Sequence, residues 1–390
     1  MGDPATPVAN TGRLWILRLG LYELLRPKEV ADDWVWIMDH TIQLGPRKCL
    51  IIVGVRLSAW EPNRGPLKHE DLTLLNLTPM EHSSGEAVEE QMRAAAAQTG
   101  KPRAVVMDGG TDLKRGTELF SRDHPGVAML RDITHKGATL LKHRLEADPR
   151  WARFVAQSNR TKLQVSQTPL AFLNPRSLKK KARYMNLDTL VRWGRDALGY
   201  LDNPRPVEGV TIHPPVLEKK LGWLREHRES LCEWAELLAL VQATEEHVRQ
   251  DGYHPLAAVE LDRRLAPIAV RPAGQAMRKA LLEFVRQQSA YARLRERLIG
   301  SSEVIESLIG KYKRLQSTNS QGGMTAMILS IGAIVAKKTI PAISDALTAI
   351  TTQDVWDWCQ THLGTTVQAQ RRIAFASPGN RNTNQIQNGP

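Results

Sequence analysis

The chain has 390 residues, with 53 lysines and arginines against 41 aspartates and glutamates, so its formal net charge is +12. A hydrophobic content of 42% and a charged content of 24% are those of a globular protein and exclude collagen-like, coiled-coil and fully disordered chains. Cys49, Cys232 and Cys359 form no CxxC pair, which excludes a disulfide scaffold and a four-thiolate zinc site. The positive charge favours a polyanionic partner, most simply nucleic acid.

Targeting and membrane signals are missing from the sequence. The N-terminal residues contain no apolar core of a secretion signal, and the most apolar run, 324–336, is shorter than the roughly 20 residues of a spanning helix. We therefore predict a buried helix at 324–336 and a cytoplasmic protein without a membrane partner, associated with the nucleoid if the source is bacterial.

The first third of the chain has the pattern of an α/β unit. Apolar residues at helical spacing predict a helix at 13–25. Short β-rich runs predict strands that end at Asp39 and Asp108, and the remaining runs complete the order β-β-β-α-β-α-β. The expected strands are 34–38, 48–57, 71–77, 103–107 and 127–130, and the expected helices are 84–99 and 113–120.

Amphipathic segments dominate from residue 134 to about residue 300 and predict an all-α insertion. They cover 136–145, 151–157, 177–198, 216–250 and 272–299, with a proline-rich break at 203–215. A helix at 301–315 follows, and the tail from Ser377 is expected to be disordered. The expected domains are an N-terminal arm (1–30), a first core part (31–135), the insertion (136–300), a second core part (301–345) and a C-terminal helix with tail (346–390).

Two aspartates follow apolar strands and suggest a cation site. Asp39 follows WVWIM, and Asp108 follows RAVVM. A carboxylate in that position is partly desolvated, and two of them on neighbouring strands repel each other. A hard divalent cation such as Mg²⁺ or Mn²⁺ relieves that repulsion. The alternative is that each aspartate only caps the turn that follows it.

A third carboxylate is offered by the segment 301–314. Glu303 and Glu306 lie one turn apart on one helix face, and Lys313 lies two turns beyond Glu306. Apolar residues on the other side of this helix would hold it against a sheet. The alternative is an ordinary solvated face of glutamates and lysines.

The order of these elements resembles the RNase H-like fold of DDE transposases and retroviral-type integrases. In this resemblance Asp39 and Asp108 take the places of the aspartates on the first and fourth strands. Glu306, with Lys313 after six intervening residues, looks like the glutamate of the bacterial insertion-sequence motif. The tyrosine and arginine of that motif would fall near Ile299 and Ser302 and are missing, so Glu303 remains an alternative third carboxylate.

Residues 132–135 (DITH) also resemble an element of cut-and-paste transposases. They fit the [C/D]xxH pattern that hAT-like and Mutator-like groups carry after the second aspartate, which gives His135 a role near DNA. The alternative for His135 is a structural histidine. The long gap before Glu306 corresponds to the all-α insertions of hairpin-forming transposases. The resemblance covers about residues 31–135 and 301–345.

The resemblance implies two-metal phosphoryl transfer on double-stranded DNA. Two Mg²⁺ or Mn²⁺ ions about 3.5–4 Å apart would activate a water or a DNA 3′-hydroxyl and stabilise the leaving oxygen. Asp39 would bridge both ions, Asp108 would bind one and Glu306 the other, while Lys313 would contact a phosphate. Cutting and joining of paired element ends implies at least a homodimer.

The helical insertion is expected to supply most of the basic surface. Its densest cluster contains Arg176, Lys179, Lys180, Lys181 and Arg183, which would bind the phosphate backbone without base specificity. The alternative is a solvated basic helix face. Trp223 and Trp234 would either stack on an extruded base or pack in the core.

Two other functions are compatible with the same fold. One is a non-catalytic, DNA-binding relic of a transposase, and the other is an RNase H-like nuclease that cuts without joining strands. About 30 residues precede the first strand, too few for a helix-turn-helix, so element ends would be recognised by the insertion or by a module missing from the front.

Overall fold

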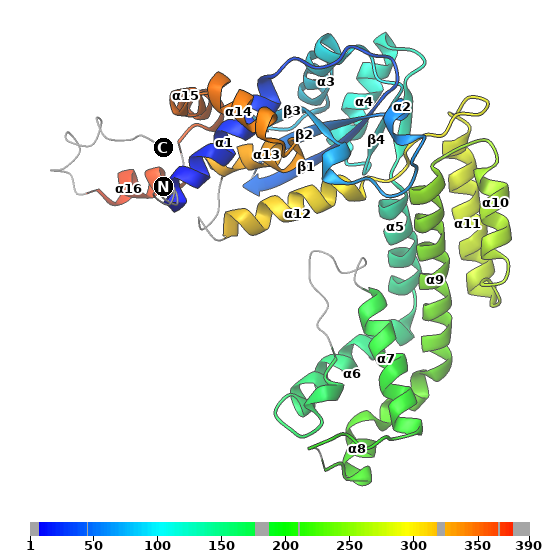
Figure 1. The fold of residues 1–390 in the computed structure, drawn as a ribbon. Coiled ribbons are helices and arrows are strands. Elements are labelled where there is room, and N and C mark those ends of the chain that lie inside the picture. Colours follow the sequence, from blue (N-terminus) through cyan, green and yellow to red (C-terminus); the bar gives the residue numbers. More distant parts are fainter. Residues whose placement is uncertain are drawn as a thin grey trace. The chain divides into compact units, whose positions relative to one another are not determined.

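The computed structural model describes residues 8–44, 46–175, 187–209, 211–317, 324–365 and 367–376 (Figure 1). The chain forms two compact units. The sheet unit contains Met1–Asp132 and Leu298–Pro390, and the helical unit contains Ile133–Arg297. The expected tail from Ser377 lies outside the described residues.

The sheet unit is built on five strands in the order β3-β2-β1-β4-β5. β1 pairs antiparallel with β2, β2 pairs antiparallel with β3, and β4 pairs parallel with both β1 and β5. The strands are β1 (Trp34–Leu44), β2 (Arg47–Arg56), β3 (Thr73–Met80), β4 (Ala104–Met107) and β5 (Ala128–Arg131). This mixed sheet, flanked by helices, confirms the expected RNase H-like α/β fold.

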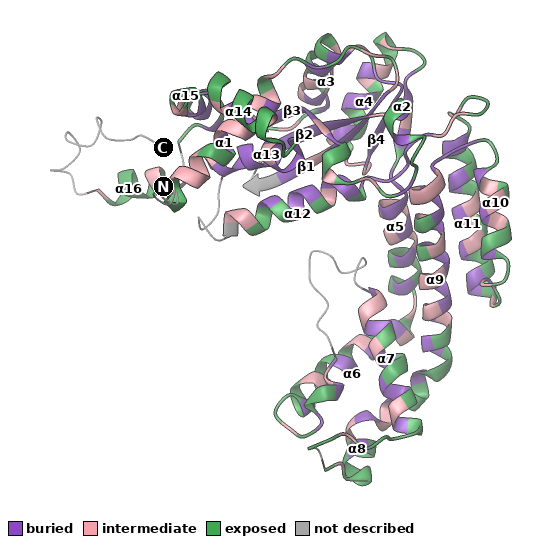
Figure 2. Ribbon diagram, viewed as in Figure 1, coloured by how far each residue is buried: buried purple, intermediate pink, exposed green. Residues whose placement is uncertain are grey.

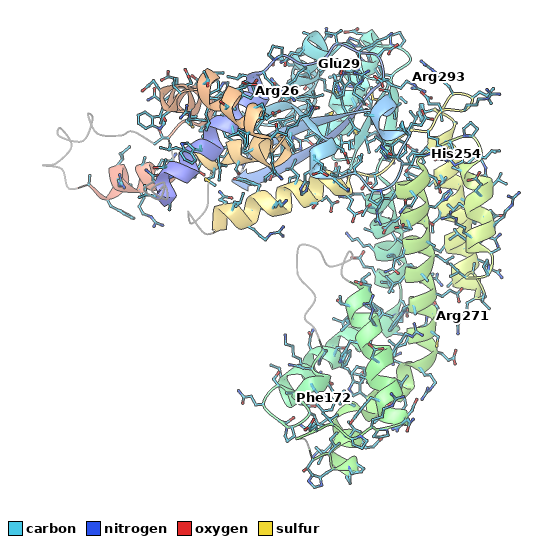
Figure 3. All side chains as sticks on the ribbon, in the orientation of Figure 1. Arg26, Glu29, Phe172, His254, Arg271 and Arg293 are labelled. Carbon is cyan, nitrogen blue, oxygen red and sulfur yellow. The ribbon has the colours of Figure 1, made fainter. Side chains whose placement is uncertain are left out.

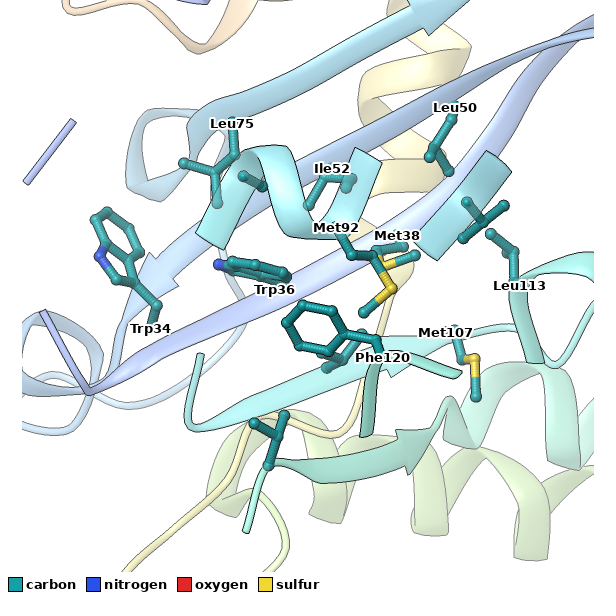
Figure 4. Packing of buried hydrophobic residues seen from close by; sticks show 14 of the residues in the cluster. Trp34, Trp36, Met38, Leu50, Ile52, Leu75, Met92, Met107, Leu113 and Phe120 are labelled. Carbon is teal, nitrogen blue, oxygen red and sulfur yellow. The ribbon is translucent and has the colours of Figure 1, made fainter. Parts of the chain in front are cut away.

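One face of the sheet packs on α3 (Gly85–Thr99) and α4 (Thr111–Asp123). Trp36 and Met38 of β1 belong to the same buried cluster as Met92 of α3 and Phe120 of α4 (Figure 4). Ser84 caps α3, since its hydroxyl accepts a hydrogen bond from the backbone of the third residue on. Alternate residues of a strand point to opposite faces, so this cluster also fixes which residues face away from it.

The other face carries α1 (Ala9–Leu25), α12 (Glu303–Ser317) and α13 (Ser330–Val335), which contact β3 or β1. Both faces of the central strands are therefore buried (Figure 2). The run 324–336 is buried as expected, but it divides into a 3-10 turn, Ala326–Leu329, and the short helix α13. The remaining elements are α2 (Leu57–Trp60), the 3-10 turn His69–Asp71, α14 (Ile340–Ala349), α15 (Thr352–Leu363) and α16 (Val367–Phe375).

The helical unit is organised around its longest helix, α9, which contacts α5, α7, α10 and α11. Its helices are α5 (Ile133–Glu146), α6 (Pro149–Val165), α7 (Leu187–Asp202), α8 (Pro214–Leu221), α9 (Arg228–Asp251), α10 (Ala257–Leu265) and α11 (Pro272–Ser289), with 3-10 turns at Ala171–Leu173 and Gly222–His227. The expected helix 216–250 is thus interrupted by a 3-10 turn, and the expected helix 272–299 ends ten residues early. Within the described ranges, every helix is too short or too polar to cross a bilayer.

An aromatic core lies around the N-terminal part of α9. Trp234 is 1% exposed, and Trp223 donates a hydrogen bond from Nε1 to Thr161 at 2.9 Å. Both tryptophans contact Phe154 and His227 in tilted or edge-to-face ring pairs. Core packing is therefore the role that the structure gives to both.

Acidification is expected to weaken this aromatic core. Burial, with a smaller contribution from Arg153, lowers the pKa of His227 below its ordinary 6.5. As the pH falls below 6.5, the unfolded chain takes up the proton more readily than the folded chain, so the free energy of unfolding falls. We expect the urea midpoint, followed by tryptophan fluorescence, to drop between pH 7 and pH 5. His227→Gln should show a smaller drop, and an equal drop in both proteins would contradict this role.

Candidate active site

Asp39 and Asp108 lie at the ends of a paired stretch of two neighbouring strands. β1 and β4 pair in parallel up to Met38 and Met107, and the two aspartates are the next residues on each chain segment. The prediction that the first strand ends at Asp39 is wrong. β1 continues to Leu44, because β2 still pairs with it after β4 has left the ladder, with Asp39 opposite Ile51. The aspartates thus lie where the parallel pair opens, the usual position of ligand sites in open α/β sheets.

Strand alternation directs Asp39 to the face that carries α12. Trp36 and Met38 point into the cluster with α3 and α4, so Asp39, the next residue, points to the opposite face. On that face α12 contacts β1. Asp39 is half-buried, and its Oδ1 accepts a hydrogen bond from the His40 backbone at 2.6 Å.

A glycine turn holds Asp108. Gly109 has φ +91°, a conformation that L side chains rarely adopt, and its missing side chain leaves room for Arg131, whose Nη2 would lie 3.3 Å from a Cβ there. The Gly110 backbone N–H then donates to Asp108 Oδ1 at 2.7 Å. The turn therefore fixes the half-buried carboxylate at the start of α4.

A second polar group lies beside this turn, on residues that the sequence analysis did not select. Lys48 Nζ lies 2.8 Å from Asp112 Oδ2, and His40 Nδ1 lies 3.8 Å from the same oxygen. Burial opposes ionisation of Asp112, but hydrogen bonds from Lys48 and Ser83 outweigh it and lower its pKa to about 2. Burial also lowers the pKa of His40, so this ring is mostly neutral at pH 7.

Glu306 lies on α12 near a buried aspartate at the end of β5. Asp132 is 1% exposed, and its Oδ1 accepts a hydrogen bond from the Ser302 backbone N–H at 3.0 Å. This bond fixes the start of α12, and one turn later a carboxylate oxygen of half-buried Glu306 lies within 4.8 Å of Asp132. Glu303, the first residue of α12, is exposed.

The three expected carboxylates do not form one tight cluster. In the part of the chain that the structure describes, the ligand atoms of Asp39, Asp108 and Glu306 do not all lie within 4.8 Å of one another. The carboxylate that approaches Glu306 is instead Asp132. Asp132 belongs to the DITH element and, like Asp108, comes shortly after an apolar run, which is the signal in the sequence that points to it.

Removing the Asp132 carboxylate should loosen the start of α12. In Asp132→Ala the buried Ser302 N–H loses its acceptor, and an unsatisfied buried donor costs about 1–3 kcal/mol. We expect the free energy of unfolding in urea to fall by that amount. Asp132→Asn is the matched control, because its amide oxygen can still accept the bond. Equal losses in the two variants would show that this hydrogen bond does not hold the helix.

The remaining expected site residues lie in different places. Lys313 is exposed on α12, and His135 is half-buried in the first turn of α5, where one of its ring nitrogens lies within 4.8 Å of a carboxylate oxygen of Glu306. The expected basic cluster lies outside the described residues: Arg176, Lys179, Lys180, Lys181 and Arg183.

Positive charge is concentrated in one of the two units. Residues 133–297, the helical unit, contain 29 lysines and arginines against 18 aspartates and glutamates, a net charge of +11. The remaining 24 basic and 23 acidic residues give the sheet unit a net charge of +1. A polyanion is therefore attracted mainly to the helical unit.

Comparisons with known proteins show only distant structural likeness. No family model matches the chain, and no curated protein matches its sequence. Among solved structures, the Drosophila P element transposase strand transfer complex is similar, with 11% identity, a TM-score of 0.44 and 86% of each chain covered.

Proposed function

We propose that this protein is a DNA transposase that cuts and joins DNA strands by metal-dependent phosphoryl transfer. Asp39, Asp108 and Glu306 are the proposed metal ligands, with Glu303 as the alternative to Glu306. The observation that carries the proposal is the parallel pairing of β1 and β4 up to Met38 and Met107, each of which is followed directly by one of the two aspartates.

The donor set at this position fits Mg²⁺ or Mn²⁺. Carboxylate oxygens are the ligands that these hard cations prefer, and two adjacent carboxylates repel each other without a cation. Two divalent ions would supply Lewis-acid activation of the attacking oxygen and stabilisation of the leaving oxygen. The chain holds Asp39 by its strand and Asp108 by its glycine turn, and Glu306 lies on α12, which contacts β1.

The second support is the charge of the helical unit. Lysines and arginines bind phosphates in any DNA sequence and release counterions, so binding is expected to weaken steeply with salt. We assign the cluster from Arg176 to Arg183 to the DNA backbone, and Lys313 and His135 to contacts near the scissile phosphate. The proposed partner is double-stranded DNA, held by at least two copies of the chain.

A strand-transfer assay tests the proposal against its two alternatives. The full chain is incubated with Mg²⁺ or Mn²⁺, a supercoiled plasmid, and labelled duplexes that span the DNA on either side of its gene. A transposase releases 3′-hydroxyl ends from these duplexes and joins them to the plasmid. Nicking without joined product would identify the nuclease, and salt-sensitive binding without either product would identify the non-catalytic relic.

A further inference from the structure

A group of metal-ligating side chains lies inside the helical unit, apart from the proposed active site. His247 belongs to the last turns of α9, His254 follows the turn at Gly252, and Glu260 lies on α10. One nitrogen of each ring and one oxygen of Glu260 all lie within 4.8 Å of one another. Figure 3 labels His254 beside the C-terminal end of α9.

The backbone is shaped to bring these side chains together. Gly252 has φ +68°, the left-handed conformation that ends α9 and turns the chain back. Both histidines are almost completely buried, with 0% of His247 and 4% of His254 exposed. Two imidazoles in such a position need polar partners for their ring nitrogens.

One hydrogen bond fixes which nitrogen of His247 carries its proton. Nε2 lies 3.0 Å from the backbone carbonyl of Ala257, and because a carbonyl only accepts, Nε2 is the N–H donor. In the neutral ring Nδ1 then has a free lone pair. A backbone carbonyl that binds the second ring nitrogen is the usual arrangement behind a metal-ligating histidine.

One ring nitrogen of each histidine faces a carboxylate. His247 Nδ1 lies 3.4 Å from Asp251 Oδ2, and His254 Nε2 lies 3.5 Å from Glu260 Oε2. Among the described residues neither nitrogen has a hydrogen-bonding partner. A ring lone pair facing a carboxylate is repulsive unless a cation lies between them. Burial also lowers the pKa of both histidines, which disfavours a proton as that cation at neutral pH.

One separation within this group matches that of a tetrahedral zinc site. Nitrogen and oxygen ligands lie about 2.0–2.1 Å from zinc, so two ligands of one tetrahedral ion are about 3.3–3.4 Å apart. The 3.5 Å between His254 Nε2 and Glu260 Oε2 is close to this value, and the 3.4 Å between His247 Nδ1 and Asp251 Oδ2 would suit Asp251 as a further ligand. Imidazole and carboxylate together are ligands that zinc accepts, whereas Mg²⁺ prefers oxygen alone.

Salt bridges with arginines distinguish Asp251 from Glu260 as a possible metal ligand. Arg264 Nη2 lies 3.6 Å from Asp251 Oδ2, and Arg297 Nη1 lies 3.8 Å from Asp251 Oδ1. The negative charge of Asp251 is therefore already compensated by two arginines. Among the described residues Glu260 forms no salt bridge with a lysine or arginine, so it is the better anionic ligand. We propose that His247, His254 and Glu260 bind one Zn²⁺, with Asp251 or a water as fourth ligand, and that the ion ties the end of α9 to α10.

Metal binding by the full chain tests this site directly. Chelator-stripped protein is titrated with Zn²⁺ by calorimetry and with Co²⁺ by visible absorption, which reports tetrahedral coordination. We expect about one ion per chain and a rise in the thermal midpoint. Glu260→Gln and His254→Gln should weaken binding at least tenfold, the smallest effect expected even for an outer partner of a metal site.

Matched controls separate this site from the proposed active site. Glu208→Gln and His213→Gln change exposed residues of the same unit and should bind Zn²⁺ like the wild type. Asp39→Asn should also leave this binding unchanged. Circular dichroism checks the fold, and Glu260→Gln, which alters a partly exposed side chain, carries the test if His254→Gln fails to fold. Unchanged affinity in folded Glu260→Gln, or no binding by the wild type, would overturn the proposal.

Discussion

Asp39→Asn and Asp108→Asn are each expected to lower the rate of metal-dependent DNA cleavage by about 100- to 1000-fold, the size of effect seen when one group that stabilises transition-state charge is removed. Asparagine keeps the shape of the side chain but loses the negative charge that attracts a divalent cation. Because Asp39 and Asp108 follow paired strands, both are expected to serve the same metal site. The double variant should therefore lose little more cleavage activity than either single variant. Initial cleavage rates in Mg²⁺ and in Mn²⁺ measure the effect.

Asp123→Asn is the matched control for these variants. Asp123 ends α4 in the same unit, and its side chain is 53% exposed, so its replacement should leave cleavage and folding unchanged. Glu303→Gln and Glu306→Gln then identify the third carboxylate. We expect the large loss in Glu306→Gln, because Glu303 is exposed at the first residue of α12. Undiminished cleavage by Asp39→Asn would contradict the proposed active site.

Gly20→Ala is expected to give the largest loss of stability for one added methyl group. A Cβ at Gly20 of α1 would lie 1.8 Å from the carbonyl oxygen of Leu329, and a Cβ at Gly332 of α13 would lie 2.4 Å from the Gly20 carbonyl oxygen. The atoms in the way are backbone, so α1 and α13 must separate. Overpacking of this kind costs about 1–3 kcal/mol or more. Urea and thermal unfolding measure the loss.

Gly12→Ala tests the same substitution on the same helix where there is room. Nothing lies within 4 Å of a Cβ at Gly12, so alanine should stabilise the helix by about 0.5–1 kcal/mol through its higher helix propensity. The two variants are thus expected to change stability in opposite directions. A Gly20→Ala protein as stable as the wild type would mean that the close approach of α1 and α13 does not contribute to the fold.

The local elements could be predicted because their signals lie within a few neighbouring residues. The runs before Asp39 and Asp108 are apolar and β-rich, and Ser84 precedes a helix with the spacing of a cap, so strand and helix type followed directly. The nine-residue helix α10 was not expected, since it is too short for a periodic pattern. The break at Gly222–His227 was missed because apolar periodicity continues through it.

By itself, the sequence determined the order of strands and helices, the paired aspartates after two apolar runs, and the basic character of the middle of the chain. Only the tertiary structure decided that β1 continues past Asp39 and that Asp132 holds the start of α12. It alone brought Gly20 against Leu329 and His247 against Glu260. The physical reason is that these features depend on backbone register and on contacts between distant segments, whereas periodicity reports only which face of one element is buried.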